Sequence, residues 1–190
     1  MHKQSLEGDR IFLLRDFLTP EECRDQIAAS ERGGYEAATI TFGGQAVEVP
    51  EIRNNNRVIV DDSQLAERWL NRVRGFLPEL LDGSQLCGLN ERFRYYRYTP
   101  GQSFQIHRDG AYHRSRSEVS MLTFIVYLND GFGGGSTDFY SNPLQRKLSV
   151  RPEVGAALIF EHMELHEGAE VTHGVKYALR TDVMYRVAHP

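Results

Sequence analysis

At 190 residues, the chain is long enough to form a single domain with a substantial hydrophobic core. Its hydrophobic content of 41% and charged content of 25% are typical of a globular protein in water. A formal net charge of −4 and an isoelectric point near 6.0 count against a polynucleotide or an acidic membrane as partner. The sequence shows neither a secretion signal nor an apolar run of membrane-spanning length, and Cys23 and Cys87 are expected to be reduced thiols. These features predict a cytoplasmic protein.

The first third of the chain is expected to contain two helices. Thr19 and Glu22 are spaced as a capping box, and Pro20 stands at the first helical position, so a helix of about three turns should begin after Thr19. Between residues 63 and 76, apolar residues recur at helical spacing with charged residues on the opposite side. This pattern predicts a second, amphipathic helix.

From about residue 86 onward, the sequence has seven short runs rich in Val, Ile, Tyr, Phe and Thr, separated by Gly, Pro, Asn or Asp. Strands of this length and spacing are typical of an antiparallel sandwich or barrel, here with the N-terminal helices packed on an outer face. We therefore predict a mainly β protein with N-terminal supporting helices (α+β). Residues 1–190 should form one domain, with a support region to about residue 85 and a β core over about 86–190. The predicted strands are 35–42 and 56–60 in the support region, and 88–99, 103–109, 118–129, 136–140, 147–152, 155–162 and 175–189 in the core.

A possible metal site begins with His107 and Asp109. These residues are two apart in a predicted strand, so their side chains should leave the same face of it. Two histidines and one carboxylate on one face of an ion form the facial triad of non-haem Fe(II) oxygenases. The third ligand would come from a distant strand, and the chain offers His162, His166 and His173. On the residues alone, the choice among these three stays open.

Five motifs occur in order between residues 98 and 186: "YTPGQSFQIHRD", "VYLND", "GGSTDF", "RPEVGAALIF" and "HEGAEVTHGVK". Their order and spacing resemble the catalytic core of the prolyl 4-hydroxylase-like 2-oxoglutarate/Fe(II) dioxygenases. The first 85 residues match that family only loosely. The resemblance implies a double-stranded β-helix core (jelly-roll, cupin-like). It also implies Fe(II), 2-oxoglutarate and O2 as cofactors, with ascorbate as a candidate addition.

The resemblance implies that His107, Asp109 and His166 bind the metal and form the catalytic centre. His166 precedes a valine, a glycine and a lysine at the spacing of the family's last motif. His173 and His162 are the less favoured candidates for the third ligand. Each of these two is otherwise expected to face solvent or to form a hydrogen bond.

The same resemblance places Lys176 against the distal carboxylate of 2-oxoglutarate, as an ammonium facing a carboxylate. Arg180 shares a face of the predicted strand with Lys176, and it would either assist the same carboxylate or hold an acid such as Asp182. Phe104 stands where many relatives have tyrosine, so one hydroxyl contact is lost. Further candidates for cosubstrate contacts are Tyr98, Tyr127 and Thr137.

The implied reaction is hydroxylation of a C–H bond, with 2-oxoglutarate converted to succinate and CO2. The carboxylate of Asp109 favours hydroxylation or oxidative demethylation over halogenation. The substrate is predicted to be a peptidyl or free amino-acid side chain, as for prolyl 4-hydroxylases, or another small molecule, because the fold does not determine the substrate. The oligomeric state stays open. Candidates for contacting a substrate carbonyl or carboxylate are Arg53, Arg57, Arg114, Arg116 and Arg186.

Three alternatives compete with this hydroxylase. A cupin-like non-haem metal enzyme that does not use 2-oxoglutarate would keep His107, Asp109 and a histidine, but it would not need Lys176. An oxidative demethylase of the same superfamily would use the same site, although the acidic net charge disfavours a nucleobase substrate. A catalytically silent jelly-roll module would be expected to lack at least one ligand, and none is missing.

Overall fold

The computed structural model describes residues 1–187 and consists mainly of antiparallel β-strands around a jelly-roll core. The strands of the larger sheet are β1 (His2–Glu7), β2 (Ile11–Arg15), β3 (Glu36–Ala37), β6 (Asn56–Asp61), β7 (Leu80–Leu81), β8 (Ser84–Leu89), β9 (Arg92–Tyr98), β11 (Glu118–Tyr127), β15 (Ala157–Glu161) and β18 (Lys176–Arg186). Those of the smaller sheet are β10 (Phe104–His107), β13 (Thr137–Asn142), β14 (Gln145–Val150) and β16 (Leu165–Gly168). Two further pairs are β4 (Ile40–Phe42) with β5 (Gln45–Val47), and β12 (Gly133–Gly134) with β17 (Val171–His173).

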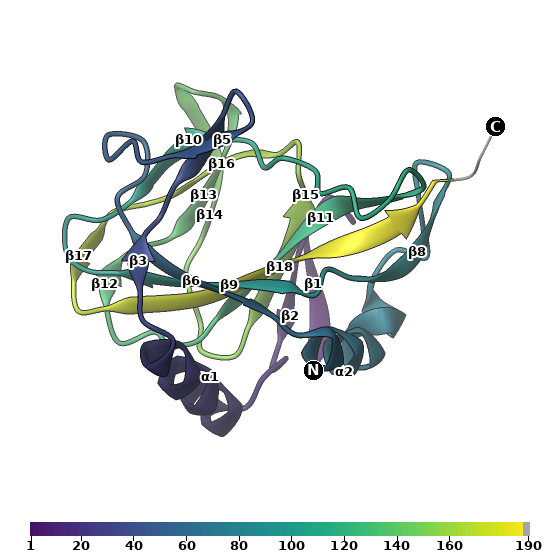
Figure 1. Cartoon of the computed structure of the whole chain (residues 1–190), viewed down its shortest axis with the longest axis horizontal. Coiled ribbons are helices and arrows are strands. Elements are labelled where there is room, and N and C mark those ends of the chain that lie inside the picture. Colours follow the sequence, from purple (N-terminus) through teal and green to yellow (C-terminus); the bar gives the residue numbers. More distant parts are fainter. Residues whose placement is uncertain (188–190) are drawn as a thin grey trace.

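The larger sheet has the order β1-β2-β15-β11-β18-β9-β6-β3, with β8 pairing to β18 and β7 to β8. The smaller sheet has the order β10-β16-β13-β14. Figure 1 shows the two helices on the side of the larger sheet that faces away from the smaller sheet. The smaller sheet therefore covers the inner face of the larger one, and the helices cover its outer face.

Both predicted helices are confirmed. Helix α1 (Pro20–Arg32) begins after Thr19, whose hydroxyl accepts a hydrogen bond from the Glu22 N–H, while the Glu22 carboxylate accepts one from the Thr19 N–H. Helix α2 (Ser63–Val73) turns its apolar side to the core, and its last predicted turn is a 3-10 turn over Arg74–Phe76.

Successive side chains of β11 point alternately to the two apolar clusters of the core, one on each side of the larger sheet. Phe124 packs edge-to-face against Phe17 in the cluster on the helix side, and Trp69 of α2 lies beside it. Tyr127 faces the opposite side of the sheet and belongs to the cluster between the sheets, together with Phe139 of the smaller sheet. A strand with apolar residues on both faces can form only at the middle of a layered core.

Each of the seven runs predicted for the core contains a strand, but the run 88–99 includes the end of β8 and all of β9, with residues 90–91 between them. Residues 188–189 of the last run lie outside the described residues. Strands β1 and β2 were not predicted, and they extend the larger sheet from the N-terminal region. The division of the chain at about residue 85 therefore stays a prediction. Among the described residues, no helix combines the length and apolar character needed to cross a membrane.

Candidate metal centre and cosubstrate pocket

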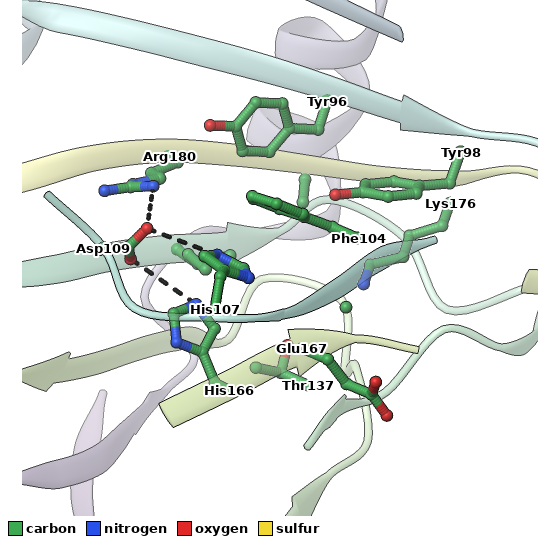
Figure 2. Close-up of a pocket in the computed structure, with 13 residues that line it drawn as sticks. Tyr96, Tyr98, Phe104, His107, Asp109, Thr137, His166, Glu167, Lys176 and Arg180 are labelled. Carbon is green, nitrogen blue, oxygen red and sulfur yellow. Dashed lines mark hydrogen bonds and ion pairs between the residues drawn. The ribbon is translucent and has the colours of Figure 1, made fainter. Parts of the chain in front are cut away.

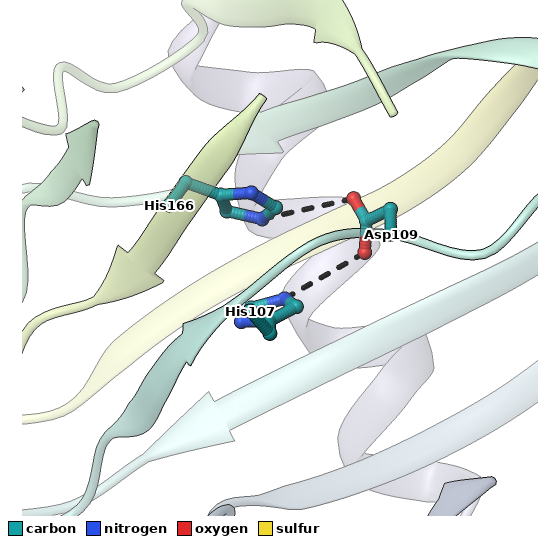
Figure 3. A group of neighbouring side chains, drawn as sticks. All are labelled: His107, Asp109 and His166. Atoms are coloured by element: carbon teal, nitrogen blue, oxygen red, sulfur yellow. Dashed lines mark ion pairs between the residues drawn. The ribbon is translucent and has the colours of Figure 1, made fainter. Parts of the chain in front are cut away.

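The side chains of His107, Asp109 and His166 converge between the two sheets, as Figure 3 shows. His107 ends β10, and its cross-strand partner in β16 is His166. The Nε2 of His107 lies 3.6 Å from one Asp109 oxygen, and the Nε2 of His166 lies 3.7 Å from the other. Within residues 1–187, this is the one group of three or more His, Cys, Asp or Glu side chains that could hold a metal ion.

Asp109 does not lie on a strand, which corrects the prediction for 103–109. Strand β10 ends at His107, and the backbone N–H of Asp109 instead donates to the carbonyl of His162 at 3.0 Å. This hydrogen bond ties the segment after β10 to the turn before β16. The two side chains therefore meet through a tertiary contact, and not through the alternation of a single strand.

Both histidines are held in the tautomer that a metal needs. The Nδ1 of His107 lies 2.8 Å from the carbonyl oxygen of Gln105, and the Nδ1 of His166 lies 2.9 Å from that of Glu164. Because a carbonyl only accepts, each Nδ1 carries the proton and each Nε2 presents its lone pair to the centre. Burial lowers the pKa of His166 to about 4, so its ring is neutral near pH 7.

Asp109 is buried and anchored through both oxygens. The Nη1 of Arg180 donates to one oxygen at 2.6 Å, and the hydroxyl of Thr123 donates to the other at 2.6 Å. Burial alone would raise the pKa of this carboxyl, but Arg180 and the histidines hold it well below its ordinary value. The group is therefore a carboxylate at neutral pH.

A hydrogen-bonded chain behind Asp109 has no counterpart in the sequence analysis. Thr123 gives its single proton to Asp109, so it accepts from the Nδ1 of His162 at 2.8 Å, and the Nε2 of His162 accepts from Ser120 at 2.8 Å. His162 is 4% exposed, and burial lowers its pKa, so the ring is neutral. The solvent-facing interpretation of His162 is wrong, and the hydrogen-bonding one is confirmed. His173 lies exposed on β17, outside the group of three.

The donor set fits a divalent metal ion. Two atoms that each lie about 2.1 Å from one ion can be at most about 4.2 Å apart. Both distances between Asp109 and the histidines lie within this limit. Two imidazoles and one carboxylate on one side, with a cavity on the other, form the arrangement typical of non-haem Fe(II) sites.

A pocket leads from this centre to Lys176, as Figure 2 shows. Lys176 is 4% exposed, its Nζ donates to the carbonyl of Gly135 at 2.7 Å, and it forms no ion pair within residues 1–187. Burial lowers its pKa to about 8. The backbone of Gly135 has a φ of +66°, and a Cβ there would lie 2.8 Å from the Phe132 ring, so only glycine fits beside the ammonium. The pocket therefore ends in a buried cation that has no counter-ion among the described residues.

The other predicted cosubstrate residues take different places. Tyr98 and Thr137 line the pocket, and Lys176 lies 5.1 Å from the centre of the Tyr98 ring. Tyr127 is buried behind this wall, with its hydroxyl 2.8 Å from that of Thr137. Arg180 also lines the pocket, but at its metal end, where it pairs with Asp109 and Asp182 (Figure 2). Of its two predicted roles, pairing with an acid is the one the geometry shows.

Comparison with known proteins agrees with this geometry. Residues 93–181 match the model of the 2OG-Fe(II) oxygenase superfamily. Residues 93–181 belong to this superfamily. Members of this superfamily are oxidoreductases of the 2-oxoglutarate/Fe(II)-dependent dioxygenase class, which use Fe(II), 2-oxoglutarate and O2. This confirms the resemblance and the cofactors predicted from the sequence, while ascorbate stays a prediction.

The chain is also similar to individual prolyl hydroxylases. It is 26% identical over 193 residues to Prolyl 4-hydroxylase 1 of Arabidopsis thaliana, covering 89% of this chain and 66% of that protein. The chain thus spans slightly less than two thirds of this relative's length.

Solved structures share the fold. A prolyl hydroxylase from Trichoplax adhaerens, in complex with a hypoxia inducible factor peptide fragment, has a TM-score of 0.70 at 17% identity, over 96% of this chain and 85% of that one. A Pseudomonas putida prolyl-4-hydroxylase has a TM-score of 0.66 at 18% identity, over 92% of each chain. The viral collagen prolyl hydroxylase of Paramecium Bursaria Chlorella virus-1, solved as a 2OG complex, has a TM-score of 0.65 at 17% identity, over 98% of this chain and 100% of that one.

Two of the five predicted substrate arginines lie near the metal centre. Arg53 and Arg57 line a cleft that also reaches His107 and Asp109. The other three do not line it: Arg114 pairs with Glu91 and Glu118, Arg186 pairs with Glu118, and Arg116 is exposed in a loop.

Proposed function

We propose that this oxygenase hydroxylates a C–H bond of a peptidyl or free amino-acid side chain in the cytoplasm, with a proline ring as the first candidate, and releases succinate and CO2. One observation carries the proposal. A single pocket has the group of His107, Asp109 and His166 at one end and, at the other, the buried ammonium of Lys176, which forms no ion pair within residues 1–187. A small dicarboxylate that also chelates a metal matches both ends of such a pocket.

In this proposal, His107, Asp109 and His166 hold Fe(II), and Lys176 holds the distal carboxylate of 2-oxoglutarate. When bound, the metal and the cosubstrate supply the activation of O2, which the protein's side chains cannot provide. The chain's own residues position the metal ion and the cosubstrate and shield them from water. Arg180 and Thr123 fix the Asp109 carboxylate, because each donates to a different oxygen.

The walls of the pocket exclude water around the cosubstrate. Tyr98 is 5% exposed and Thr137 is 4% exposed, and the hydroxyl of Thr137 is held by that of Tyr127. Phe104 stacks on the His107 ring, with ring centres 3.5 Å apart, so the ring of this metal-binding histidine is covered on one face. We propose that these residues line and support the cosubstrate site, where a low dielectric strengthens the contact between Lys176 and a carboxylate.

The relatives support a peptidyl substrate. The Arabidopsis relative is a prolyl 4-hydroxylase, and the Trichoplax structure contains a peptide fragment. An open cleft of about 590 Å³ adjoins the metal-binding group and is large enough for a short peptide segment. We therefore place the proline-containing segment in this cleft, with the reacting carbon towards His107 and Asp109.

The proposal is tested by incubating the protein with Fe(II), 2-oxoglutarate, O2 and a capped tripeptide with a central proline. The expected result is a product heavier by one oxygen atom, with succinate in equal amount, detected by mass spectrometry. Free L-proline in a parallel reaction separates a peptidyl from a free amino-acid substrate, and an anaerobic reaction is the control. Succinate release without oxygen transfer to either compound would contradict proline as the substrate residue.

A further inference from the structure

The cleft beside the metal-binding group is strongly cationic. Besides His107 and Asp109, its lining contains five arginines, whereas Asp109 is the single carboxylate among the described residues that line it. Lys176 does not line this cleft, so it is distinct from the proposed cosubstrate end of the site. The five are Arg53, Arg57, Arg94, Arg108 and Arg180.

Only two of these arginines are neutralised. Arg94 and Arg180 pair with the buried Asp182 at 3.2 and 3.0 Å, and Arg180 also pairs with Asp109. The other three form no ion pair within the part of the chain that the structure describes. Their side chains donate to uncharged acceptors, which are the side chain of Asn55, the carbonyl and hydroxyl oxygens of Thr39, and the carbonyl of Met163. The cleft therefore has an excess of positive charge.

Arg53 is the most specialised of the three. Its guanidinium lies between the rings of Tyr96 and Phe104, 4.6 and 4.4 Å from their centres, and the residue is only 6% exposed. Its Nε donates to Asn55 at 2.8 Å, whereas its buried Nη2 has no hydrogen-bond partner among residues 1–187. A buried, charged N–H without an acceptor is costly, so the site is suited to a ligand that supplies one.

The stack that holds Arg53 ends at the metal-binding group. Phe104 faces Arg53 on one side and the His107 ring on the other, because two groups cannot occupy the same face of one ring. Figure 2 shows Phe104 between Tyr96 and His107. A single aromatic layer thus separates the Arg53 guanidinium from a metal-binding imidazole. An anion bound by Arg53 would lie close to the position of oxidation.

The ionisation of neighbouring groups agrees with this excess charge. Burial alone would raise the pKa of Tyr96, but Arg53, Arg180 and Arg94 lower it below the ordinary value. Burial and the positive charge of Arg53 also lower the pKa of Arg57. Uncompensated cations therefore act on each other across the cleft.

We propose that the substrate carries a carboxylate close to the C–H bond that is oxidised, and that Arg53, assisted by Arg57, binds it. The planar guanidinium suits a carboxylate because it can donate two parallel hydrogen bonds. The carboxylate belongs either to an acidic residue of a peptide or to the free α-carboxylate of an amino acid. This inference rests on the proposed function for the reaction, but its ligand chemistry comes from the cleft alone.

The test compares acids with their neutral amides. Calorimetry is performed without O2 on protein loaded with Fe(II) and 2-oxoglutarate, so that the Lys176 end is occupied. The probes are acetyl-Ala-Pro-Asp-amide against acetyl-Ala-Pro-Asn-amide, and L-proline against L-prolinamide. The acid of at least one pair is expected to bind at least about tenfold more tightly than its amide, as for a hydrogen bond to a charged group. The pair that shows the preference identifies the source of the carboxylate.

Substitutions of the cleft arginines show which side chains cause the preference for the acid over its amide. Arg53→Met keeps an unbranched side chain between the two rings and should abolish the preference for the acid, while the affinity for the amide stays unchanged. Arg57→Met should reduce the preference, and because Arg57 is only half-buried, this variant decides the matter if Arg53→Met does not fold. Arg116→Met, an exposed arginine outside the cleft, should leave the preference intact.

Three results would overturn the proposal: equal affinity for acid and amide in both pairs, no binding of either acid, or a preference that survives both cleft substitutions. The visible absorption band of chelated 2-oxoglutarate is recorded when the protein is loaded with Fe(II) and 2-oxoglutarate. It separates these three results from a failure of the proposed function. With the band present, a missing preference refutes only the carboxylate proposal. With the band absent, the proposed function fails, and the preference for an acid is still measured on the same samples.

Discussion

Asp109→Ala is expected to lower iron-dependent turnover by more than about a thousandfold, well beyond the 10- to 100-fold typical of losing an outer partner of a metal ligand. The substitution removes the single carboxylate of the proposed ligand set and leaves two histidines. It also takes an acceptor from Arg180, whose Nε already has no partner among the described residues. Succinate release from 2-oxoglutarate measures turnover, and calorimetry with Fe(II) under nitrogen measures metal affinity.

The matched control for this variant is Asp61→Ala. Asp61 is an acid of β6 that pairs with Arg92 on the surface, and it lines neither the pocket nor the cleft. The control should keep both turnover and Fe(II) affinity, because an exposed ion pair contributes little to stability. Normal succinate release by Asp109→Ala would show that this carboxylate is not a metal ligand.

Lys176→Met is expected to raise the 2-oxoglutarate concentration needed for half-maximal binding by about 100-fold, as for the loss of a buried hydrogen bond to a charged group. The affinity for Fe(II) should stay unchanged, because Lys176 lies at the opposite end of the pocket. Methionine is unbranched and only one atom shorter than lysine, and it removes a charge that burial disfavours. The folded state should therefore not lose stability. Lys3→Met, a substitution on the edge strand β1 of the larger sheet, is the control that should behave as the wild type.

The same lysine gives cosubstrate binding a specific pH dependence. Burial lowers the pKa of Lys176 to about 8, and a carboxylate binds only the protonated ammonium well. The dissociation constant of 2-oxoglutarate should therefore be flat below about pH 8 and rise with pH above it, whereas Lys176→Met should show no such rise. An unchanged cosubstrate requirement in Lys176→Met would show that this lysine does not hold the distal carboxylate of 2-oxoglutarate.

Local sequence signals predicted the regular elements well. The capping box at Thr19 and the alternating, β-branched runs of the core are decided by nearby residues, so they could be read directly. Strand β2, with the sequence IFLLR, was missed because a short run that is apolar on both faces gives no period. Strand β16 was missed because four residues that include a histidine and a glutamate do not resemble a strand.

The candidate site was predictable only through the resemblance. Asp109 and Arg180 are 71 positions apart, and the bond between them depends on which strands pair. The chain through Thr123 and His162 joins β11 to a turn 39 residues later, again through tertiary structure. The stacking of Arg53 between two aromatic rings has no local signal at all. Spacing identified which residues to consider, and the fold supplied the contacts that orient them.

The most direct test of the account is an anaerobic titration of the purified protein, first with Fe(II) and then with 2-oxoglutarate. The visible charge-transfer band of the chelated cosubstrate is recorded for the wild type, His166→Ala and His173→Ala. The account predicts the band in the wild type and in His173→Ala, because His173 lies exposed on β17, and its loss in His166→Ala. Absence of the band in wild-type protein that has bound iron, or its persistence in His166→Ala, would contradict the proposed metal centre.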